Sequence, residues 1–308
     1  MNYVRPFFLF NRHLETIYPA LLRKVSTPPY TLNRLTTPDN DFLDTFLITQ
    51  QSERCIIISH GLEGNALRPY MVGMANAFFA AGFDVILWNF RGCGEELNHQ
   101  LRFYHSGATD DLDVVVQFAQ QLEYSQINLI GFSLGGNMTL KYLGERLASP
   151  IHRAVALSVP LHLASSCQKI SEAANRIYSN RFLNSLKSKI VRKAAIMPEI
   201  DTKGIDRIKT LFDFDDRYTA PLHGFEDADH YYNECSSTRF VQNIQVPTLI
   251  INALNDPFLS RECYPVKQLE RHPYVKLDIP EKGGHVGFSQ FRKNGLYWSE
   301  ERALHFIN

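Results

Sequence analysis

The stretch LIGFSLGGN, residues 129–137, surrounds one serine with glycines directly after an apolar run. Its centre, GFSLG, matches G-x-S-x-G, the pattern in which a strand turns sharply into a helix and exposes a nucleophilic serine. Glycines two positions before and two positions after the serine let neighbouring backbone pass without Cβ clashes. The apolar residues 127–130 and the helical pattern of residues 137–143 supply the strand and the helix. We therefore take Ser133 as the candidate nucleophile, in preference to a serine that only caps a helix.

Apolar runs typical of buried strands recur along the chain, and helical patterns follow several of them. The predicted strands are 55–61, 84–92, 127–133, 154–160, 248–254 and 275–280, and the predicted helices are 73–82, 110–122 and 137–148. Apolar strands that alternate with amphipathic helices indicate a mostly parallel sheet covered on both faces. Segments 30–37 and 42–49 predict more exposed strands at an antiparallel start of the sheet. Together with the serine turn, this order predicts an α/β-hydrolase fold.

The interval between Pro160 and Pro247 interrupts this alternation. It contains no clear strand, whereas residues 170–197 and 227–235 have helical patterns. We interpret it as a helical cap insertion, which in α/β enzymes lies over the carboxyl ends of the strands, where ligands bind. The predicted organisation is 1–160 for the N-terminal arm and first part of the core, 161–243 for the cap, and 244–308 for the rest of the core.

A serine hydroxyl needs a general base to become a nucleophile, and in this fold the order along the chain is Ser, then Asp or Glu, then His. Three histidines come late enough. His272 precedes a predicted strand, at the wrong end of the sheet, and His305 lies in a C-terminal helical pattern. His285 follows the predicted strand 275–280 after two glycines, so we choose it as the base.

Asp256 is the candidate acid that orients the histidine. It follows the strand pattern of residues 248–254 and precedes Pro257, so it lies just past the carboxyl end of a strand. An Asx turn before proline is the alternative interpretation of this aspartate. Asp278 alternates with apolar residues inside a strand pattern, which puts it on the polar face. Asp256 is the better candidate.

Two backbone N–H groups normally bind the negative oxygen that develops during acyl transfer. In this fold one belongs to the residue after the nucleophile, here Leu134, and the other to the turn after the third strand. That turn is SHGLEGN, residues 59–65, so Leu62 is the second candidate donor, with Gly61 permitting close approach. The helix expected to begin at Gly136 directs its positive end toward the same place.

Six motifs in order give the chain a family resemblance. They are NRHLETI (11–17), SHGLEGN (59–65), NFRGCGEELN (89–98), YHSGATDDL (104–112), GFSLGGN (131–137) and DDRYTAPLHGF (215–225). Together they resemble the YheT-like α/β-hydrolases. The resemblance implies carboxylesterase activity, with eukaryotic relatives described as lipases or medium-chain acyltransferases. It places the family's catalytic triad on Ser133, Asp256 and His285. Eukaryotic relatives carry an N-terminal membrane anchor, which we do not expect here.

Charge and cysteine content exclude other classes. Basic and acidic residues number 32 each, so the formal net charge is zero, and nucleic acid is not an expected partner. Five cysteines are scattered without a C-x-x-C pair, which favours a reducing compartment over a disulfide framework. We expect no cofactor and no metal. The expected partner is a small-molecule ester, and the oligomeric state stays open.

The N-terminus indicates neither a signal peptide nor a transmembrane segment. No apolar run approaches the roughly 20 residues that a spanning helix needs, so we expect a cytoplasmic protein. The aromatic patch from Phe7 to Phe10 is followed at once by Asn11, Arg12 and His13. We expect this patch to pack on the protein's own body, with at most a weak membrane-surface contact by the arm. His13 should hold the arm to the body.

Three functions remain to be compared. The first is a serine esterase, a carboxylic ester hydrolase that cleaves short- to medium-chain acyl esters through an acyl-enzyme on Ser133. The second is an acyltransferase in which an alcohol replaces water, and the third is a binding protein without turnover. The acyltransferase finds one apparent signal in the spacing of His105 and Asp110. We interpret that segment as a helix start, with Thr109 or Asp110 as the cap.

Overall fold

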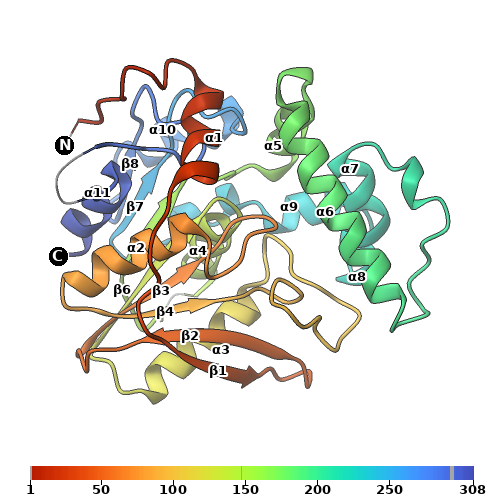
Figure 1. The fold of residues 1–308 in the computed structure, drawn as a ribbon, viewed down its shortest axis with the longest axis horizontal. Coiled ribbons are helices and arrows are strands. Elements are labelled where there is room, and N and C mark those ends of the chain that lie inside the picture. The colour runs from red at the N-terminus through yellow and green to blue at the C-terminus, as the bar shows by residue number, and fades with distance from the viewer. Residues whose placement is uncertain (1, 147, 292–294) are drawn as a thin grey trace.

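The computed structural model describes residues 2–146, 148–291 and 295–308. The strands among these residues are β1 (Thr31–Thr36), β2 (Phe42–Ile48), β3 (Arg54–Ser59), β4 (Asp84–Trp88), β5 (Gln126–Phe132), β6 (Ile151–Leu157), β7 (Thr248–Ile251) and β8 (Val275–Asp278). They form one sheet in the order β1-β2-β4-β3-β5-β6-β7-β8 (Figure 1). β2 is antiparallel to both of its neighbours, and all later neighbouring pairs are parallel. The mostly parallel sheet with an antiparallel start is confirmed.

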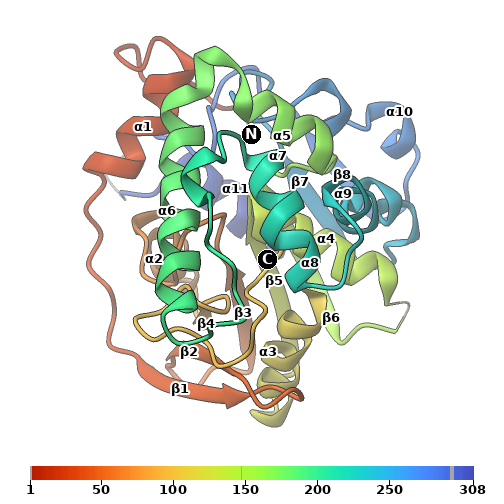
Figure 2. The ribbon, with the colours of Figure 1, turned by 90° about the vertical axis from the view of Figure 1, so that its right-hand side faces the viewer.

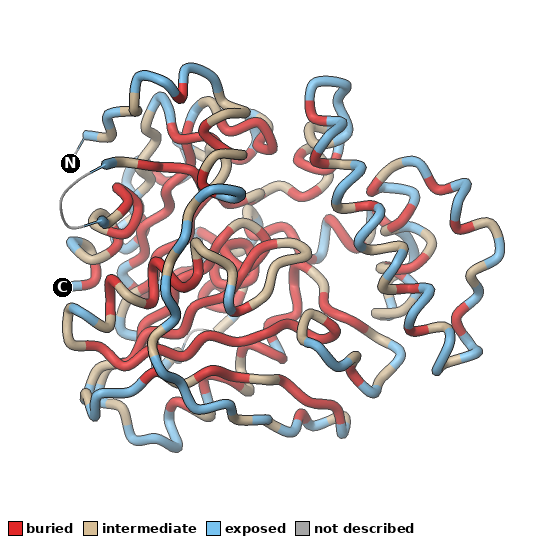
Figure 3. The backbone as a smooth tube through the Cα atoms, viewed as in Figure 1, coloured by how far each residue is buried: buried red, intermediate tan, exposed pale blue. Residues whose placement is uncertain are grey.

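Helices cover both faces of this sheet. The flanking helices are α2 (Pro69–Ala80), α3 (Thr109–Gln121), α4 (Leu134–Glu145) and α11 (Trp298–Ile307). Successive strand residues point to opposite faces, so each central strand contributes to two apolar cores. Ile56 and Ile58 of β3 share one core with residues of α2 and α11, and Cys55 and Ile57 share the other with residues of α3 and α4. The buried backbone in Figure 3 follows the sheet between these layers, and the α/β-hydrolase fold is confirmed.

The segment between β6 and β7 is helical. Its helices are α5 (Leu163–Ser171), α6 (Arg176–Ala194), α7 (Leu211–Phe214), α8 (Ala220–Leu222) and α9 (Ala228–Cys235). Every residue from 158 to 247 is described, and none of them lies in a strand. Figures 1 and 2 show α5 to α8 as a group beside the sheet. The helical content agrees with the expected cap, while its boundaries at 161 and 243 stay a prediction.

Shorter elements complete the described chain. The 3₁₀ helices are Ala173–Asn175, Ile205–Arg207, Ser237–Arg239, Val241–Asn243 and Arg261–Cys263, a π-helical turn spans Asp215–Thr219, and a short helix, α10, spans Val266–Leu269. The helix predicted over 137–148 corresponds to α4, which begins earlier and ends at Glu145. Position 147 of that prediction lies outside the described residues.

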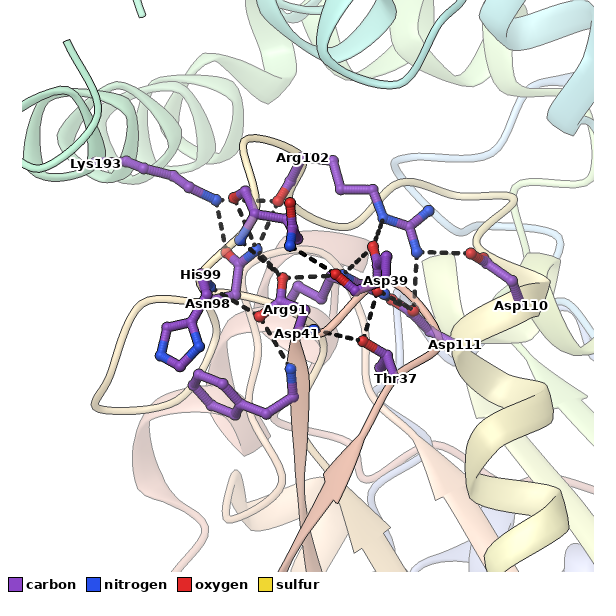
Figure 4. A network of polar contacts seen from close by, with 12 residues as sticks. Thr37, Asp39, Asp41, Arg91, Asn98, His99, Arg102, Asp110, Asp111 and Lys193 are labelled. Carbon is purple, nitrogen blue, oxygen red and sulfur yellow. Dashed lines mark hydrogen bonds and ion pairs between the residues drawn. The ribbon is translucent and has the colours of Figure 1, made fainter. Parts of the chain in front are cut away.

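Arg91, in the turn after β4, is the centre of a buried ionic cluster (Figure 4). Its guanidinium group pairs with Asp39 (2.9 Å), Asp41 (2.9 Å) and Asp111 (2.7 Å). The first two aspartates lie between β1 and β2, and Asp111 lies in the first turn of α3. A buried charge is tolerated when its hydrogen-bonding atoms are paired, as they are here. One side chain therefore joins the turn after β4 to the β1–β2 connection and to α3.

Lys193 brings α6 into the same cluster. Its ammonium group is buried and donates hydrogen bonds to Asn98 Oδ1 (2.8 Å) and to the carbonyl oxygen of Arg102 (3.0 Å). Asn98 in turn donates to the Asp41 carboxylate (2.7 Å). Burial lowers the pKa of Lys193 to about 7. The cap is thereby tied to the loop that follows β4, at the carboxyl end of the sheet.

The N-terminal arm leads into α1 (Arg12–Leu22) and exposes part of its aromatic patch. Phe7 is 90% exposed and Phe10 is 68% exposed, so the expectation that the patch packs on the body is wrong for both. Leu9 does pack on the body at 2% exposed, and the Phe8 ring, although 40% exposed, contacts Tyr18 and Phe291. Within the described ranges, no helix combines the length and the apolar character needed to cross a membrane.

Candidate active site

Ser133 lies between the last residue of β5 and the first residue of α4. Its backbone has φ +52° and ψ −116°, a conformation that costs a non-glycine residue about 1–3 kcal/mol. The Ser133 N–H donates to the carbonyl oxygen of Leu157 in β6 (2.8 Å), which helps to hold this conformation. The side chain is thus presented beyond the carboxyl end of the sheet, as a nucleophile elbow requires.

The glycines around Ser133 occupy positions that have no room for a side chain. A Cβ atom at Gly135 would lie 2.5 Å from the carbonyl oxygen of His60, and one at Gly131 would lie 2.6 Å from Thr139 Oγ1. Both separations are shorter than carbon and oxygen atoms tolerate without bonding. Gly135 is therefore required because the turn after β3 touches α4, and Gly131 because the end of β5 packs against the first turns of α4.

Ser133, His285 and Asp256 form a hydrogen-bonded chain. The Ser133 hydroxyl is 3.0 Å from Nε2 of His285, and Nδ1 of the same imidazole is 2.8 Å from Asp256 Oδ2. The Asp256 side chain is fully buried and that of His285 is 10% exposed. A buried carboxylate beside Nδ1 keeps the proton on that nitrogen, which leaves Nε2 free to accept the serine proton. The structure brings the three predicted residues into one line.

Asp256 also forms the turn that local sequence suggested. Its Oδ1 accepts a hydrogen bond from the Phe258 N–H (2.9 Å), two residues further along. The Phe258 ring lies against the imidazole of His285, with ring centroids 4.2 Å apart. The Asx turn and the contact with histidine are therefore both present, since one carboxylate oxygen can accept more than one hydrogen bond and His285 Nδ1 lies 2.8 Å from Oδ2 and 3.1 Å from Oδ1.

The rejected candidates are engaged elsewhere in the fold. Nδ1 of His272 accepts hydrogen bonds from the backbone N–H groups of Tyr274 and Val275 before β8. Asp278 pairs with Arg302 of α11 at 2.7 Å. His305 lies on an exposed position of α11.

The two predicted oxyanion donors lie on adjoining turns. A Cβ atom at Gly61 would be only 3.2 Å from Ser133 Cβ, and the Gly135 N–H donates to the carbonyl oxygen of His60 (3.1 Å). Within residues 2–146, 148–291 and 295–308, neither the Leu62 N–H nor the Leu134 N–H has a hydrogen-bond partner. α4 begins at Leu134 and not at Gly136, so its positive end is closer to Ser133 than predicted.

His60 holds the turn that contains Leu62. Its imidazole is fully buried, and burial lowers the pKa of His60 to about 3, so it stays neutral. Nδ1 lies 2.8 Å from the Gly61 carbonyl oxygen, and Nε2 accepts the Phe90 N–H (3.2 Å). His60 therefore links the turns after β3 and β4.

Glu63 is a site residue that the sequence analysis missed. Its backbone has φ +51°, and its N–H donates to the Tyr104 hydroxyl (2.9 Å). The carboxylate accepts hydrogen bonds from Lys189 (2.5 Å) and Ser185 (2.5 Å), both on α6. The cap helix thus contacts the residue next to Leu62. Only the quoted motif SHGLEGN marked this position, and its partners on α6 lie more than a hundred residues away.

His105 and Asp110 do not act as a pair. The half-buried His105 has its ring centroid 4.7 Å from that of His223, while Asp110 pairs with Arg102 (2.7 Å). α3 does begin here, at Thr109, but its N-cap is Ala108, which has no capping side chain. The predicted cap is wrong because Thr109 bonds to Glu145 and Asp110 pairs with arginine.

His13 contacts the cap helix as well as the arm. Its Nδ1 lies 3.2 Å from the hydroxyl of Tyr178 in α6, and the two rings stack.

Among the described residues, no group of three or more His, Cys, Asp or Glu side chains has an arrangement that could hold a metal ion.

Comparison with known proteins agrees with the α/β-hydrolase fold. The α/β-hydrolase-fold family matches residues 55–191. YheT of Escherichia coli, which carries an esterase name, is 35% identical over 90% of this chain and 84% of its own length. Monoacylglycerol lipase of Saccharomyces cerevisiae is 26% identical over 86% of this chain, and phospholipase ABHD3 of Mus musculus is 27% identical over 79%. The chain spans 61% and 60% of those two proteins.

Solved structures share the fold. The esterase Pf2001 of Pyrococcus furiosus has a TM-score of 0.61 at 17% identity, over 92% of this chain and 97% of its own. At that identity the likeness concerns the fold alone. The family follows from YheT, whose similarity extends over nine-tenths of the sequence at 35% identity. The chain belongs to the YheT-like family of α/β hydrolases.

Proposed function

We propose that the protein is a serine esterase that cleaves carboxylic esters with short- to medium-chain acyl groups through an acyl-enzyme on Ser133. The observation that carries this proposal is the hydrogen-bonded chain from Ser133 through His285 to the buried Asp256. Relatives named as an esterase, a monoacylglycerol lipase and a phospholipase support ester hydrolysis as the reaction class.

Acylation begins when Ser133 Oγ attacks the ester carbonyl carbon and His285 Nε2 takes the hydroxyl proton. The carbonyl oxygen becomes negative and accepts hydrogen bonds from the N–H groups of Leu62 and Leu134. Asp256 stabilises the positive imidazole without taking its proton. When the tetrahedral intermediate collapses, the C–O bond to the alcohol breaks and His285 returns the proton to the leaving oxygen.

Deacylation repeats these steps with water. His285 Nε2 removes a proton from a water molecule as its oxygen attacks the acyl carbon. The second tetrahedral intermediate expels Ser133 Oγ, which recovers its proton from His285, and a carboxylic acid leaves. Every proton is carried by a residue of the chain, so the cycle requires no cofactor.

A small, largely apolar cavity lies under the cap, close to the oxyanion turn. Its volume is about 30 Å³. Its lining includes Phe103, Tyr104, Leu186, Ile190, Phe214 and Leu222. Tyr104 accepts the Glu63 N–H, so this cavity begins one residue from the oxyanion turn. This volume corresponds to about one water molecule, so the cavity does not itself set the length of the acyl chain.

The test measures hydrolysis of p-nitrophenyl esters across acyl lengths by the native protein, by Ser133→Ala and by Ser179→Ala. Ser179 is a half-buried serine of α6 whose hydroxyl donates to the carbonyl oxygen of Arg176 in the same helix, which makes it a matched control. We expect a rate that peaks at a short or medium length, is retained in Ser179→Ala and is lost in Ser133→Ala. Activity that survives in Ser133→Ala would contradict the proposal.

Absence of hydrolysis by the native protein at every acyl length would also contradict the proposal. In that case, transfer of the acyl group to an added alcohol would identify an acyltransferase with the same acyl-enzyme. Binding of the ester without turnover would identify a protein that has kept the fold and lost the reaction.

We further propose that the exposed aromatic arm makes a weak contact with a lipid surface. Phe7 and Phe10 are solvent-exposed, and Arg5 and Lys24 lie in the same N-terminal region. Exposed aromatic side chains suit a membrane interface, and basic residues nearby in the sequence suit a membrane that carries anionic lipids.

A further inference from the structure

The loop that carries His285 has an unusual backbone. Positive φ angles occur at Gly283 (147°), Gly284 (59°), Val286 (54°) and Phe288 (43°). Positive φ is costly for residues with a Cβ atom and persists only when surrounding structure over-determines it. Something outside the loop must therefore hold the imidazole at hydrogen-bond distance from Ser133.

Side chains from other segments hold this loop. Four consecutive backbone N–H groups, from Gly283 to Val286, each donate to a different side-chain oxygen. The acceptors are, in order, Glu15 Oε1 (3.1 Å), Asn255 Oδ1 (3.1 Å), Thr16 Oγ1 (2.9 Å) and Ser158 Oγ (2.9 Å). No strand partner is needed, because side chains supply the acceptors that a sheet would otherwise provide.

Glu15 joins this loop to the turn that carries Asp256. Its carboxylate is 1% exposed, and its second oxygen accepts a hydrogen bond from Asn255 Nδ2 (2.5 Å). Asn255 immediately precedes Asp256. Burial raises the pKa of Glu15, and the hydrogen bonds from Asn255 and Gly283 oppose that rise by favouring the ionised form. Glu15 thus bridges the segments that carry the candidate base and the candidate acid.

α1 also touches the loop through its backbone. A Cβ atom at Gly284 would lie 2.8 Å from Thr16 Oγ1, and one at Gly287 would overlap the carbonyl oxygen of Glu15. The two glycines allow helix and loop to approach until the hydroxyl of Thr16 meets the His285 N–H. Thr16 Oγ1 is itself oriented, because it donates to the carbonyl oxygen of Arg12 (2.7 Å).

We infer that Glu15 and Thr16 are positioning residues that fix His285 relative to Ser133 and Asp256. The inference rests on the proposed function, since its importance for rate requires His285 to act as the base. Neither residue touches the reacting atoms. Thr16 holds the backbone of the histidine itself, and Glu15 ties the two catalytic loops together.

The test compares Thr16→Val, which keeps the shape and removes the acceptor, with Thr16→Ser, which keeps the hydroxyl. We expect Thr16→Val to lower kcat about tenfold, the factor that corresponds to losing one hydrogen bond, with little change in KM. Thr16→Ser should recover most of the rate. Ser171→Ala serves as the matched control, because Ser171 in α5 makes the same kind of hydroxyl-to-carbonyl bond within its helix.

Glu15→Gln is compared in the same way with Glu300→Gln. Both glutamates are 1% exposed, and Glu300 pairs with Arg23 at 2.7 Å. We expect Glu15→Gln to lower kcat. The glutamine amide has one oxygen, so its NH₂ group would face the donor Asn255 Nδ2 and that hydrogen bond would be lost. Glu300→Gln should lower the melting temperature and leave kcat unchanged. Equal kcat in native protein, Thr16→Val and Glu15→Gln would overturn the inference.

A second readout does not depend on activity. Amide hydrogen exchange of the peptide that contains residues 281–290 should accelerate in Thr16→Val and stay native-like in Thr16→Ser and Ser171→Ala. If the native protein hydrolyses no ester, the proposed function is wrong. The hydrogen-exchange rate of residues 281–290 then tests the positioning inference by itself. Faster exchange in Thr16→Val would then support positioning by α1, and unchanged exchange would overturn it.

Discussion

The ammonium group of Lys189 lies 2.5 Å from the carboxylate of Glu63, and this pair joins the cap to the oxyanion turn. Lys189 lies in the second half of α6, and Glu63 follows Leu62 directly. The side chains are 11% and 6% exposed, so the pair is largely shielded from water and salt. The position of α6 and the position of the Leu62 N–H are therefore not independent.

Lys189→Met should lower kcat/KM about tenfold, because an unpaired buried carboxylate would leave its place and move the Leu62 N–H. Lys187→Met is the matched control, since Lys187 on the same helix donates to the carbonyl oxygen of Ile208 and not to the turn. Steady-state kinetics on a p-nitrophenyl ester would compare them. Equal losses in both variants would show that the effect comes from general damage to α6.

Asp256→Asn separates the catalytic part of Asp256 from its structural part. Asparagine keeps an oxygen that can accept the Phe258 N–H, so the turn and the melting temperature should change little. It cannot favour the productive tautomer of His285 or balance its positive charge, so kcat should fall by about 10⁴-fold. Thermal unfolding and kinetics on the same sample would check both. A stable variant with near-native kcat would remove Asp256 from the mechanism.

Lys193 makes stability depend on pH above neutrality. Burial lowers its folded-state pKa from 10.5 to about 7, so between those values the unfolded chain binds a proton that the native chain does not. The free energy of unfolding should therefore rise with pH in this window, by up to roughly 1.4 kcal/mol per pH unit. Urea unfolding of native protein and Lys193→Met from about pH 7 to about pH 8, below the ordinary cysteine pKa, measures this slope. Identical slopes in the two proteins would contradict it.

The exposed arm predicts binding to lipid vesicles. Phe7→Ser combined with Phe10→Ser should reduce co-sedimentation with vesicles of phosphatidylcholine and phosphatidylglycerol, because the aromatic rings no longer enter the interface. Val266→Ser is the control, since Val266 is also an exposed apolar residue (52%) but lies on α10. Native protein that ignores these vesicles would contradict the lipid contact.

The strands, the serine turn and the choice of Ser133, Asp256 and His285 could be predicted from the amino-acid sequence. These features have local signals. Buried parallel strands read as apolar runs, and the turn after β5 requires glycines where backbones touch. Asp256 and His285 each follow such a run, so the ends of parallel strands place them at one edge of the sheet.

The contacts that hold those residues in place are visible only in the folded structure. Glu63 meets Lys189, Thr16 meets His285, and Arg91 meets Asp41 across long stretches of chain, with no periodicity that marks the partner. The folded structure also shows that Phe7 is exposed and that Thr109 bonds to Glu145 instead of capping α3. The physical reason is that such contacts depend on which segments the sheet brings together, whereas local sequence records only what each segment prefers alone.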